Sequence, residues 1–230
     1  MEPELSPLGD CGVRIVFGHE ISLEIHACIR QFGSVLNADP IRGMTEWVCG
    51  YAVVTVYYQP WIVSYDALCA ALRQRLRQRD LAGTLPERVV ETPVCYGGEF
   101  GPDLEDAARH CGLSAAEMIQ RHAEPFYRVY FLGFLPGFAY LGGLPPSLAV
   151  PRRSVPRLAV PIGAVGIAGE QTGVYPLQTP GGWQIIGRTP LNLYDPQREP
   201  PSLLALGDSV KFAPICPDQF ADFEEDYAPD

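Results

Sequence analysis

FLGFLPGFAYLGG, residues 131–143, and VPIGAVGIAGEQTGVYPLQTPGGWQIIGRTP, residues 160–190, are the stretches that decide the fold. The first holds four glycines and four aromatic residues among thirteen, with no charged residue, a composition that suits neither a stable helix nor a solvated loop. The second holds seven glycines and four prolines, with short apolar runs at 165–168 and 183–186. Short strands separated by sharp corners predict a barrel or sandwich with an aromatic-lined pocket or groove.

The segment before residue 96 predicts a smaller mixed domain. Strand patterns occur at residues 11–17, 46–50, 52–58 and 88–95. Two helices are indicated by apolar residues that recur every three or four positions: Ile21, Ile25, Ile29, Phe32 and Leu36 in the first, and Leu68, Leu72 and Leu76 in the second, which Ser64 opens. The predicted order is β-α-β-β-α-β, the ferredoxin-like arrangement in which two helices cover one face of a four-stranded antiparallel sheet.

A glycine-rich junction after Tyr96 leads into a pair of helices and then into strands. Asp103 is predicted to cap a helix over residues 104–111, and Ser114 with Glu117 forms a capping box for the next helix, which Pro125 ends. Strand candidates then follow at 126–133, 138–143, 157–161, 163–169, 173–177, 183–188, 191–196 and 209–215. We therefore expect an α+β protein with a ferredoxin-like domain at 1–88 and a mainly β barrel domain at 89–230, which begins with the helical pair and ends in an acidic tail.

Composition and charge exclude several classes of protein. No apolar run approaches the ~20 residues that span a bilayer, and residues 1–10 lack a signal-peptide pattern, so we expect a cytoplasmic protein. The formal charge of −10 argues against nucleic-acid binding. Seven scattered cysteines without a CxxC pair indicate neither a disulfide framework nor a metal site. The tail at 218–230 carries six acidic residues and no basic one, which fits a solvated end or an interaction segment.

Several long motifs resemble one known family. They are GGEFGPDLEDAARHCGLSAAEMIQRH (97–122), VYFLGFLPGFAYLGGLP (129–145), PRRSVPR (151–157), VGIAGEQTGVYPLQTPGGWQIIGRTPLNLYDP (165–196) and LGDSVKFAPI (206–215), with LGDCGVRIVFG (8–18) and AVVTVYYQP (52–60) before them. Together they are similar to the KipI / PxpB family, also called allophanate hydrolase subunit 1. The resemblance implies a ferredoxin-like domain followed by a cyclophilin-like β-barrel.

The same resemblance implies three alternative functions. The first is the B-type subunit of a bacterial ATP-dependent 5-oxoprolinase, a hydrolase that opens 5-oxo-L-proline to L-glutamate together with a PxpA-type and a KipA / PxpC-type subunit. The second is a KipI-like inhibitor that binds a sporulation histidine kinase. The third is the carboxyltransferase part of a urea carboxylase, for which this chain has no biotin-attachment context. We expect the first, as one subunit that is inactive alone and that can form a homodimer when no partner is present.

ATP has no evident site in the sequence. The chain lacks a GxxxxGK[ST] phosphate loop, and its single lysine, Lys211, follows no glycine-rich segment. We therefore expect ATP to bind to the complex, on a partner or at a shared interface, and we assign neither cofactor-binding nor metal-binding residues to this chain.

His122 and Asp195 are the candidate catalytic residues. His122 ends a predicted helix just before the aromatic stretch, where the helix C-terminus favours an imidazolium that could act as a general acid. A hydrogen-bonded structural histidine is an equal alternative. Asp195 precedes a proline in NLYDP and is more often a turn former than a proton-transfer group.

The candidate substrate-binding residues surround the glycine-rich stretches. Gln171 and Thr172 lie between Gly169 and Gly173, where a tight loop would turn side chains and N–H groups outward, although a plain β-turn is equally consistent. Four aromatic residues complete the predicted set, namely Phe138, Tyr140, Tyr175 and Trp183. Each could instead be a barrel-wall residue, but their number favours a groove for a flat ring or a proline-like group.

Overall fold

The computed structural model describes residues 3–79 and 86–226 of the chain. It divides into two compact units, Met1–Pro86 and Glu87–Asp230, each with its own hydrophobic core. This boundary lies two residues before the predicted one, which is between residues 88 and 89. No helix within the described ranges is both long and apolar enough to cross a membrane.

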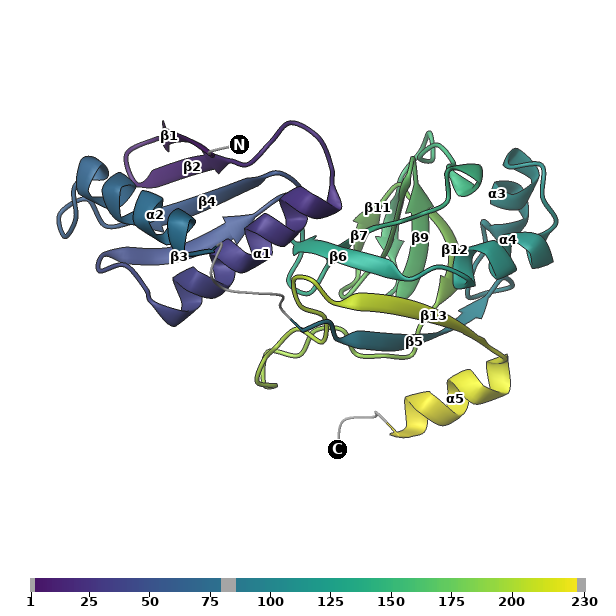
Figure 1. Cartoon of the computed structure of the whole chain (residues 1–230). Coiled ribbons are helices and arrows are strands. Elements are labelled where there is room, and N and C mark those ends of the chain that lie inside the picture. The colour runs from purple at the N-terminus through teal and green to yellow at the C-terminus, as the bar shows by residue number, and fades with distance from the viewer. Residues whose placement is uncertain (1–2, 80–85, 227–230) are drawn as a thin grey trace. The chain divides into compact units, whose positions relative to one another are not determined.

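The first unit is a four-stranded antiparallel sheet covered by two helices (Figure 1). Its strands, in spatial order, are β1 (Glu4–Leu8), β2 (Gly12–Val16), β4 (Val53–Tyr58) and β3 (Met44–Cys49). The helices α1 (Leu23–Ala38) and α2 (Tyr65–Arg79) pack against each other and against the sheet. Ile29, Phe32 and Leu36 of α1 and Leu68 and Leu72 of α2 are completely buried, as their spacing predicts.

Two details of this unit differ from the sequence predictions. Residues 88–95 were expected to supply its fourth strand, but they form β5 (Val89–Tyr96), which belongs to the barrel. The fourth strand is β1, whose short sequence ELSPL contains a proline and lacks a clear alternation. The order is therefore β-β-α-β-β-α, and the predicted β-α-β-β-α-β order is wrong.

The buried stripe of α1 is also one residue shorter than predicted. The hydroxyl of Ser22 accepts a hydrogen bond from the N–H of Ile25 at 3.1 Å, which fixes the helix start at Leu23. Ile21 consequently lies outside the helix and is 57% exposed.

The second unit is built on a closed seven-stranded barrel (Figure 1). Around the barrel the strands are β10 (Gln171–Val174), β7 (Ala139–Gly142), β6 (Tyr127–Leu132), β13 (Ser209–Ile215), β5, β12 (Gln184–Arg188) and β9 (Ala164–Ala168). A two-stranded ribbon of β8 (Arg157–Val160) and β11 (Thr179–Gly181) is separate from it. The α+β class with a closed barrel is thus confirmed, whereas residues 191–196 form no strand and hold only an isolated bridge between Tyr194 and Ser202.

Three helices lie beside the barrel: α3 (Leu104–His110), α4 (Ala115–Ala123) and α5 (Pro217–Asp226). α3 contacts β12 and α4 contacts β13. The predicted capping box at the start of α4 is present, because the Ser114 hydroxyl accepts a hydrogen bond from Glu117 N–H and the Glu117 carboxylate accepts one from Ser114 N–H. Asp103 makes no such cap on α3; its carboxylate is used elsewhere, as described below.

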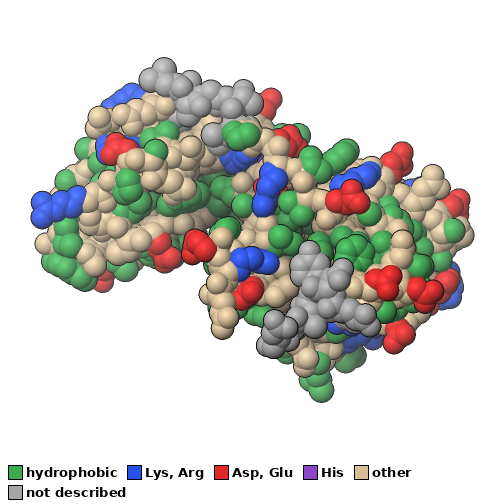
Figure 2. All heavy atoms as spheres, turned by 90° about the horizontal axis from the view of Figure 1, so that it is seen from below, with side chains coloured by type: hydrophobic (Ala, Val, Ile, Leu, Met, Phe, Trp, Pro, Cys, Tyr) green, Lys and Arg blue, Asp and Glu red, His purple; other side chains and the backbone are tan. Residues whose placement is uncertain are grey.

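Acidic and basic side chains are mixed on the face of the molecule drawn in Figure 2. The Lys and Arg side chains visible on that face are interspersed with Asp and Glu side chains. This distribution agrees with the net charge of −10.

Candidate functional site

A pocket of about 340 Å³ opens in the second unit, and we refer to it as the aromatic pocket. Its lining residues are Phe134, Phe138, Tyr140, Arg152, Pro156, Tyr175, Pro180, Gly181, Gly182 and Trp183. They come from the β6–β7 loop and β7, from the segment before β8, from the residue that follows β10, and from β11 with the two residues that lead into β12. The two glycine-rich stretches therefore meet at one place, although they are separate in the sequence.

Phe138 is the centre of the pocket wall. It is 2% exposed and lies edge-on to Tyr140, Tyr175 and Trp183, with ring centroids 5.2, 5.6 and 5.7 Å apart. Edge-to-face packing of this kind fixes the rings relative to one another. A Cβ at Gly181 would lie 2.7 Å from the Tyr175 hydroxyl oxygen, so the absence of a side chain at this position keeps the pocket open.

Phe134 stands at the mouth of the pocket in a strained conformation. Its φ angle is 67°, the only positive value among the described residues other than glycine, and such a conformation costs on the order of 1–3 kcal/mol. The ring is 63% exposed and lies edge-on to Phe138, with the centroids 5.6 Å apart. The chain thus holds a large apolar side chain out toward solvent beside the pocket.

Asp103 anchors the segment that carries Arg152 and Pro156. Its carboxylate is 5% exposed and accepts hydrogen bonds from Arg153 at 2.8 Å, from Arg157 at 2.7 Å through each oxygen, and from the N–H of Ile185 at 2.7 Å. These partners satisfy the carboxylate completely. The segment at 152–157 is therefore fixed against β12 by a charged network, which explains why Asp103 is unavailable as a helix cap.

Arg152 adds a positive charge at the pocket itself. It is exposed and lines the pocket, whereas Arg153 and Arg157 share Asp103. Burial raises the pKa of the Tyr175 hydroxyl, and the Arg152 cation opposes part of that rise. The pocket therefore combines apolar rings with a cationic rim.

The structure brings four of the six predicted substrate-binding residues into this pocket: Phe138, Tyr140, Tyr175 and Trp183. Gln171 and Thr172 do not line it. Gly169 and Glu170 form the turn between β9 and β10, and Gln171 and Thr172 lie within β10, paired with Ala168 and Ile167. Thr172 is completely buried, so the prediction that its side chain faces outward is wrong and the plain β-turn alternative holds.

His122 is a buried member of a hydrogen-bonded chain across the barrel. Its exposure is 0%, and its ring stacks on Phe212 with centroids 4.7 Å apart. The Thr172 hydroxyl donates to the carbonyl of Gly166 at 3.0 Å, so its oxygen must accept from Nε2–H of His122 at 2.9 Å. Nδ1 is then unprotonated and accepts from the Tyr96 hydroxyl at 2.8 Å.

The expectation of an imidazolium at residue 122 is therefore wrong. Burial lowers the pKa of His122 to about 3, and this desolvation outweighs the effect of the helix C-terminus, which is worth at most ~2 kcal/mol. Burial also raises the pKa of Tyr96 well above its ordinary value, which keeps its hydroxyl protonated as a donor. The geometry supports the structural alternative for His122, because the ring lies inside the barrel and is absent from the pocket lining.

Asp195 also lies outside the aromatic pocket. Its carboxylate accepts a hydrogen bond from the N–H of Gln197 at 2.8 Å, and its own N–H donates to the carbonyl of Pro201 at 2.9 Å. This local pattern is an Asx-turn, the turn-former alternative for an aspartate before proline. The structure thus brings His122 and Asp195 neither to each other nor into the lining of the aromatic pocket.

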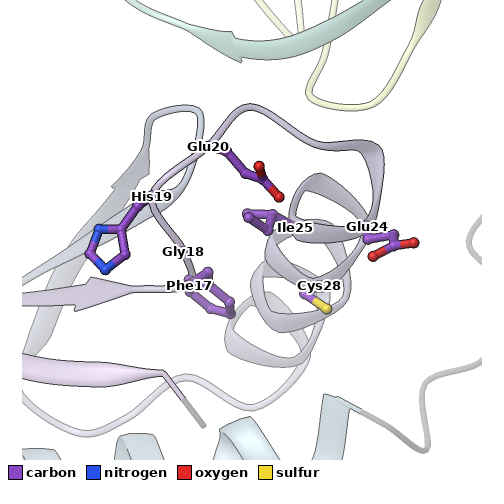
Figure 3. Close-up of a pocket in the computed structure, with 7 residues that line it drawn as sticks. All are labelled: Phe17, Gly18, His19, Glu20, Glu24, Ile25 and Cys28. Atoms are coloured by element: carbon purple, nitrogen blue, oxygen red, sulfur yellow. The ribbon is translucent and has the colours of Figure 1, made fainter. Parts of the chain in front are cut away.

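A second hollow, of about 450 Å³, lies in the first unit between the β2–α1 loop and α1. Figure 3 shows its seven lining residues: Phe17, Gly18, His19, Glu20, Glu24, Ile25 and Cys28. Glu20 extends from the loop toward the helix, while His19 lies on the other side of the loop. Two glutamates without a lysine or arginine disfavour an anionic ligand in this hollow, whereas the aromatic pocket has Arg152 in its lining.

Sequence reasoning missed three lining residues that matter for this site: Phe134, Arg152 and Pro156. The motif PRRSVPR contains two of them, but its three arginines are equivalent by sequence, and only the position of Asp103 distinguishes Arg152 from the other two. Within the described ranges, no group of three or more His, Cys, Asp or Glu residues is arranged to hold a metal ion.

Comparison with known proteins gives the family. A model described as "Carboxyltransferase domain, subdomain C and D" matches residues 3–204. The chain is 41% identical over 233 residues to a protein from Bacillus subtilis (strain 168) that is named as the B-type subunit of 5-oxoprolinase, and the match covers 97% of each chain. It is 60% identical over 127 residues to a protein of the same name from Escherichia coli O157:H7, a match that covers 55% of this chain and 58% of the relative.

Solved structures agree with the fold. The crystal structure of TTHA0988 superposes with a TM-score of 0.79 at 38% identity and covers 89% of this chain. The present chain accounts for 40% of the TTHA0988 chain. The matched region therefore forms part of a longer polypeptide in that protein.

Proposed function

Because this chain belongs to the family of carboxyltransferase domains, subdomains C and D, which confirms the resemblance to KipI / PxpB proteins, we propose that it is the B-type subunit of a 5-oxoprolinase. The observation that carries this proposal is the 41% identity over 97% of both chains with the Bacillus subtilis protein of that name. A chain with this role works within a multi-subunit enzyme.

The proposed reaction is the ATP-dependent hydrolysis of 5-oxo-L-proline to L-glutamate. A lactam is a weak electrophile, so transfer of the γ-phosphoryl group of ATP to the lactam oxygen would release ADP and produce an activated carbon. Attack of water on that carbon and protonation of the ring nitrogen would break the C–N bond and leave an acyl phosphate, and attack of a second water on the acyl carbon would release phosphate and L-glutamate. This sequence of steps predicts that the oxygen of the lactam carbonyl appears in the released phosphate, and unlabelled phosphate from labelled 5-oxo-L-proline would contradict it.

The aromatic pocket is the proposed place for the substrate ring. Its apolar rings provide flat surfaces for a five-membered ring, and Arg152 provides a positive charge. His122 and Asp195 are more consistent with structural roles, because one is buried and the other completes a turn. The groups that transfer protons are therefore proposed to come from a partner protein.

ATP is proposed to bind to a partner or at a shared interface. The single lysine, Lys211, donates a hydrogen bond to the carbonyl of Glu124 and lies over the ring of Phe126 at 5.0 Å. Its ammonium group is thus used within the second unit. This supports the expectation that a KipA / PxpC-type subunit and a PxpA-type subunit supply the rest of the site.

The surface beside the aromatic pocket supports a protein partner. Three large apolar residues there are strongly exposed: Phe134 by 63%, Val155 by 72% and Leu158 by 92%. Exposed apolar residues grouped at a pocket mouth are typical of a surface that another protein covers. The same observation favours a second candidate function, a KipI-like inhibitor that binds a histidine kinase.

Reconstitution with the PxpA-type and the KipA / PxpC-type subunits from the same cell tests the proposal. We expect glutamate release from 5-oxo-L-proline and ATP only when this chain is added. A well-formed complex without activity would reject the oxoprolinase assignment and favour the kinase inhibitor. Autophosphorylation of a histidine kinase would then be measured with the wild-type chain and with Leu158→Glu, a change that places a charge on the apolar surface.

A further inference from the structure

We propose that Arg152 is the residue that binds the carboxylate of the substrate in the aromatic pocket, so that the pocket selects a small ring compound that carries an anionic group. This inference rests on the proposed function for the identity of the ligand. It assigns a specificity-determining role to a residue that sequence reasoning did not single out.

The three arginines of the segment at 152–157 differ in the surroundings of their positive charges. Arg153 and Arg157 both donate to the buried carboxylate of Asp103 over 2.7–2.8 Å. Their guanidinium groups point toward β12, where Asp103 also accepts from the N–H of Ile185 at 2.7 Å. Two arginines and one aspartate leave a net charge of +1 in that network.

Arg152 has a different environment. It is exposed and lines the pocket together with the aromatic rings. Asp103 makes four hydrogen bonds to other donors, so it has no remaining capacity to neutralise Arg152. The rim of the pocket therefore carries a charge of about +2 when the Asp103 network is included, on a chain whose net charge is −10.

The segment before β8 holds Arg152 in place. Arg153 and Arg157 lie on either side of Pro156 and tie this segment to Asp103, while the N–H of Arg153 donates to the carbonyl of Gly182 at 2.8 Å. The backbone next to Arg152 is thereby fixed to the rim that Gly182 and Trp183 form. Preorganisation of this kind lowers the entropic cost of ligand binding.

A planar guanidinium forms two parallel hydrogen bonds with a carboxylate. The aromatic rings beside it exclude water from one side, which strengthens such a contact. The carboxyl group of 5-oxo-L-proline has an ordinary α-carboxyl pKa of ~3.5 and is ionised at neutral pH. A ligand with its ring against Phe138 and Trp183 and its carboxylate at Arg152 would use both parts of the pocket.

Tryptophan fluorescence tests the proposal on the full chain. The three tryptophans are Trp47, Trp61 and Trp183, so Trp47→Phe with Trp61→Phe leaves Trp183 in the pocket wall as the only reporter. At pH 7 we expect 5-oxo-L-proline to bind about 10- to 100-fold more tightly than 5-oxo-L-prolinamide, which has the same ring without the charge. Added salt should weaken binding of the acid and leave that of the amide unchanged.

Substitutions at position 152 then test whether Arg152 causes the preference for the acid over the amide. Arg152→Gln should abolish the preference for the acid, and Arg152→Lys should restore part of it, because a lysine keeps the charge but not the bidentate geometry. Arg109→Gln is the matched control, since Arg109 is 75% exposed on α3 and lies outside the pocket. Equal binding of the acid and the amide, a preference that survives Arg152→Gln, or no response to either ligand would each overturn the proposal.

The reconstituted enzyme separates this inference from the proposed function. If Arg152→Gln leaves the KM for 5-oxo-L-proline unchanged in an active complex, the oxoprolinase assignment stands and the role of Arg152 is rejected. If the wild-type complex is inactive while Trp183 still reports an Arg152-dependent preference for the acid over the amide, the pocket is an anion site and the oxoprolinase assignment is rejected.

Discussion

His122 should make the stability of the second unit fall as the pH is lowered from neutral. The histidine is completely buried, and its pKa in the folded chain is lowered to about 3 from the ordinary 6.5 by burial. Between these two values the unfolded chain binds a proton at this position and the folded chain does not. The free energy of unfolding therefore decreases as the pH falls below 6.5.

The size of the effect follows from the two pKa values. At pH 4.5 the unfolded histidine is about two pH units below its ordinary pKa, while the folded one remains neutral. Each unit corresponds to ~1.4 kcal/mol, so the second unit should lose about 3 kcal/mol of stability from this group between pH 7.5 and 4.5. Protonation would also give both ring nitrogens a hydrogen and disrupt the bond that Nδ1 accepts from Tyr96.

The assay compares urea unfolding of the wild-type chain and of His122→Gln at both pH values. Glutamine can donate and accept hydrogen bonds but does not titrate, so the contributions of other groups cancel in the difference. When Trp47 and Trp61 are replaced by phenylalanine, the fluorescence emission of Trp183 reports on the unfolding of the second unit alone. We expect His122→Gln to be destabilised at pH 7.5 and to lose about 3 kcal/mol less than the parent on acidification.

A difference between the two proteins that does not change with pH would refute this reasoning. It would mean that water reaches the imidazole and that its pKa is the same in the folded and the unfolded chain. NMR gives an independent measurement, because the ring C–H resonances of a buried neutral His122 should not shift between pH 8 and 4.5.

Four further substitutions test other parts of the structure. Gly181→Ala should weaken ligand binding in the aromatic pocket about tenfold, since the added Cβ would lie 2.7 Å from the Tyr175 hydroxyl oxygen; fluorescence titration measures it, and unchanged affinity would place the ligand elsewhere. Ser114→Ala should lower the free energy of unfolding by about 1 kcal/mol through loss of the α4 capping box, and an unchanged urea midpoint would contradict that role. Asp103→Asn should cost roughly 2 kcal/mol, discounted for the partial exposure of its arginine partners, and should weaken the preference of the pocket for a carboxylate ligand over its amide. Asp195→Ala should leave glutamate release by the reconstituted enzyme within about twofold of wild type, because its carboxylate only completes a turn; a loss of tenfold or more would return it to the catalytic site.

Local sequence patterns were sufficient to predict those structural features that depend on residues within a single helix or strand. The spacing of Ile29, Phe32 and Leu36 predicts a helix face that is buried in the structure. Ser114 and Glu117 predict the start of α4, because a capping box involves only residues within one turn. The long motifs of the second half also identified the family correctly.

Local sequence patterns did not predict features that depend on contacts with residues far away in the sequence. Residues 88–95 have the character of a strand, but nothing local states which sheet they join, and pairing with β13 places them in the barrel. Asp103 has the position of a helix cap, yet arginines 50 and 54 residues away bind its carboxylate. A pairing over such distances in sequence is decided by tertiary contacts and leaves no periodic signal.

The candidate site, too, was predicted from the sequence only in part. The amino-acid sequence alone was enough to show that aromatic rings and glycines gather in one region, because glycine and aromatic content are local properties, and four of the six residues proposed from it line the pocket. The packed structure was needed to show that His122 is a neutral, buried link between Tyr96 and Thr172. It was also needed to show that Arg152 faces the aromatic pocket, while the other two arginines of its motif bind Asp103. Burial and the position of opposite charges set the protonation state and the direction of a side chain, and both arise only when segments far apart in the chain pack together.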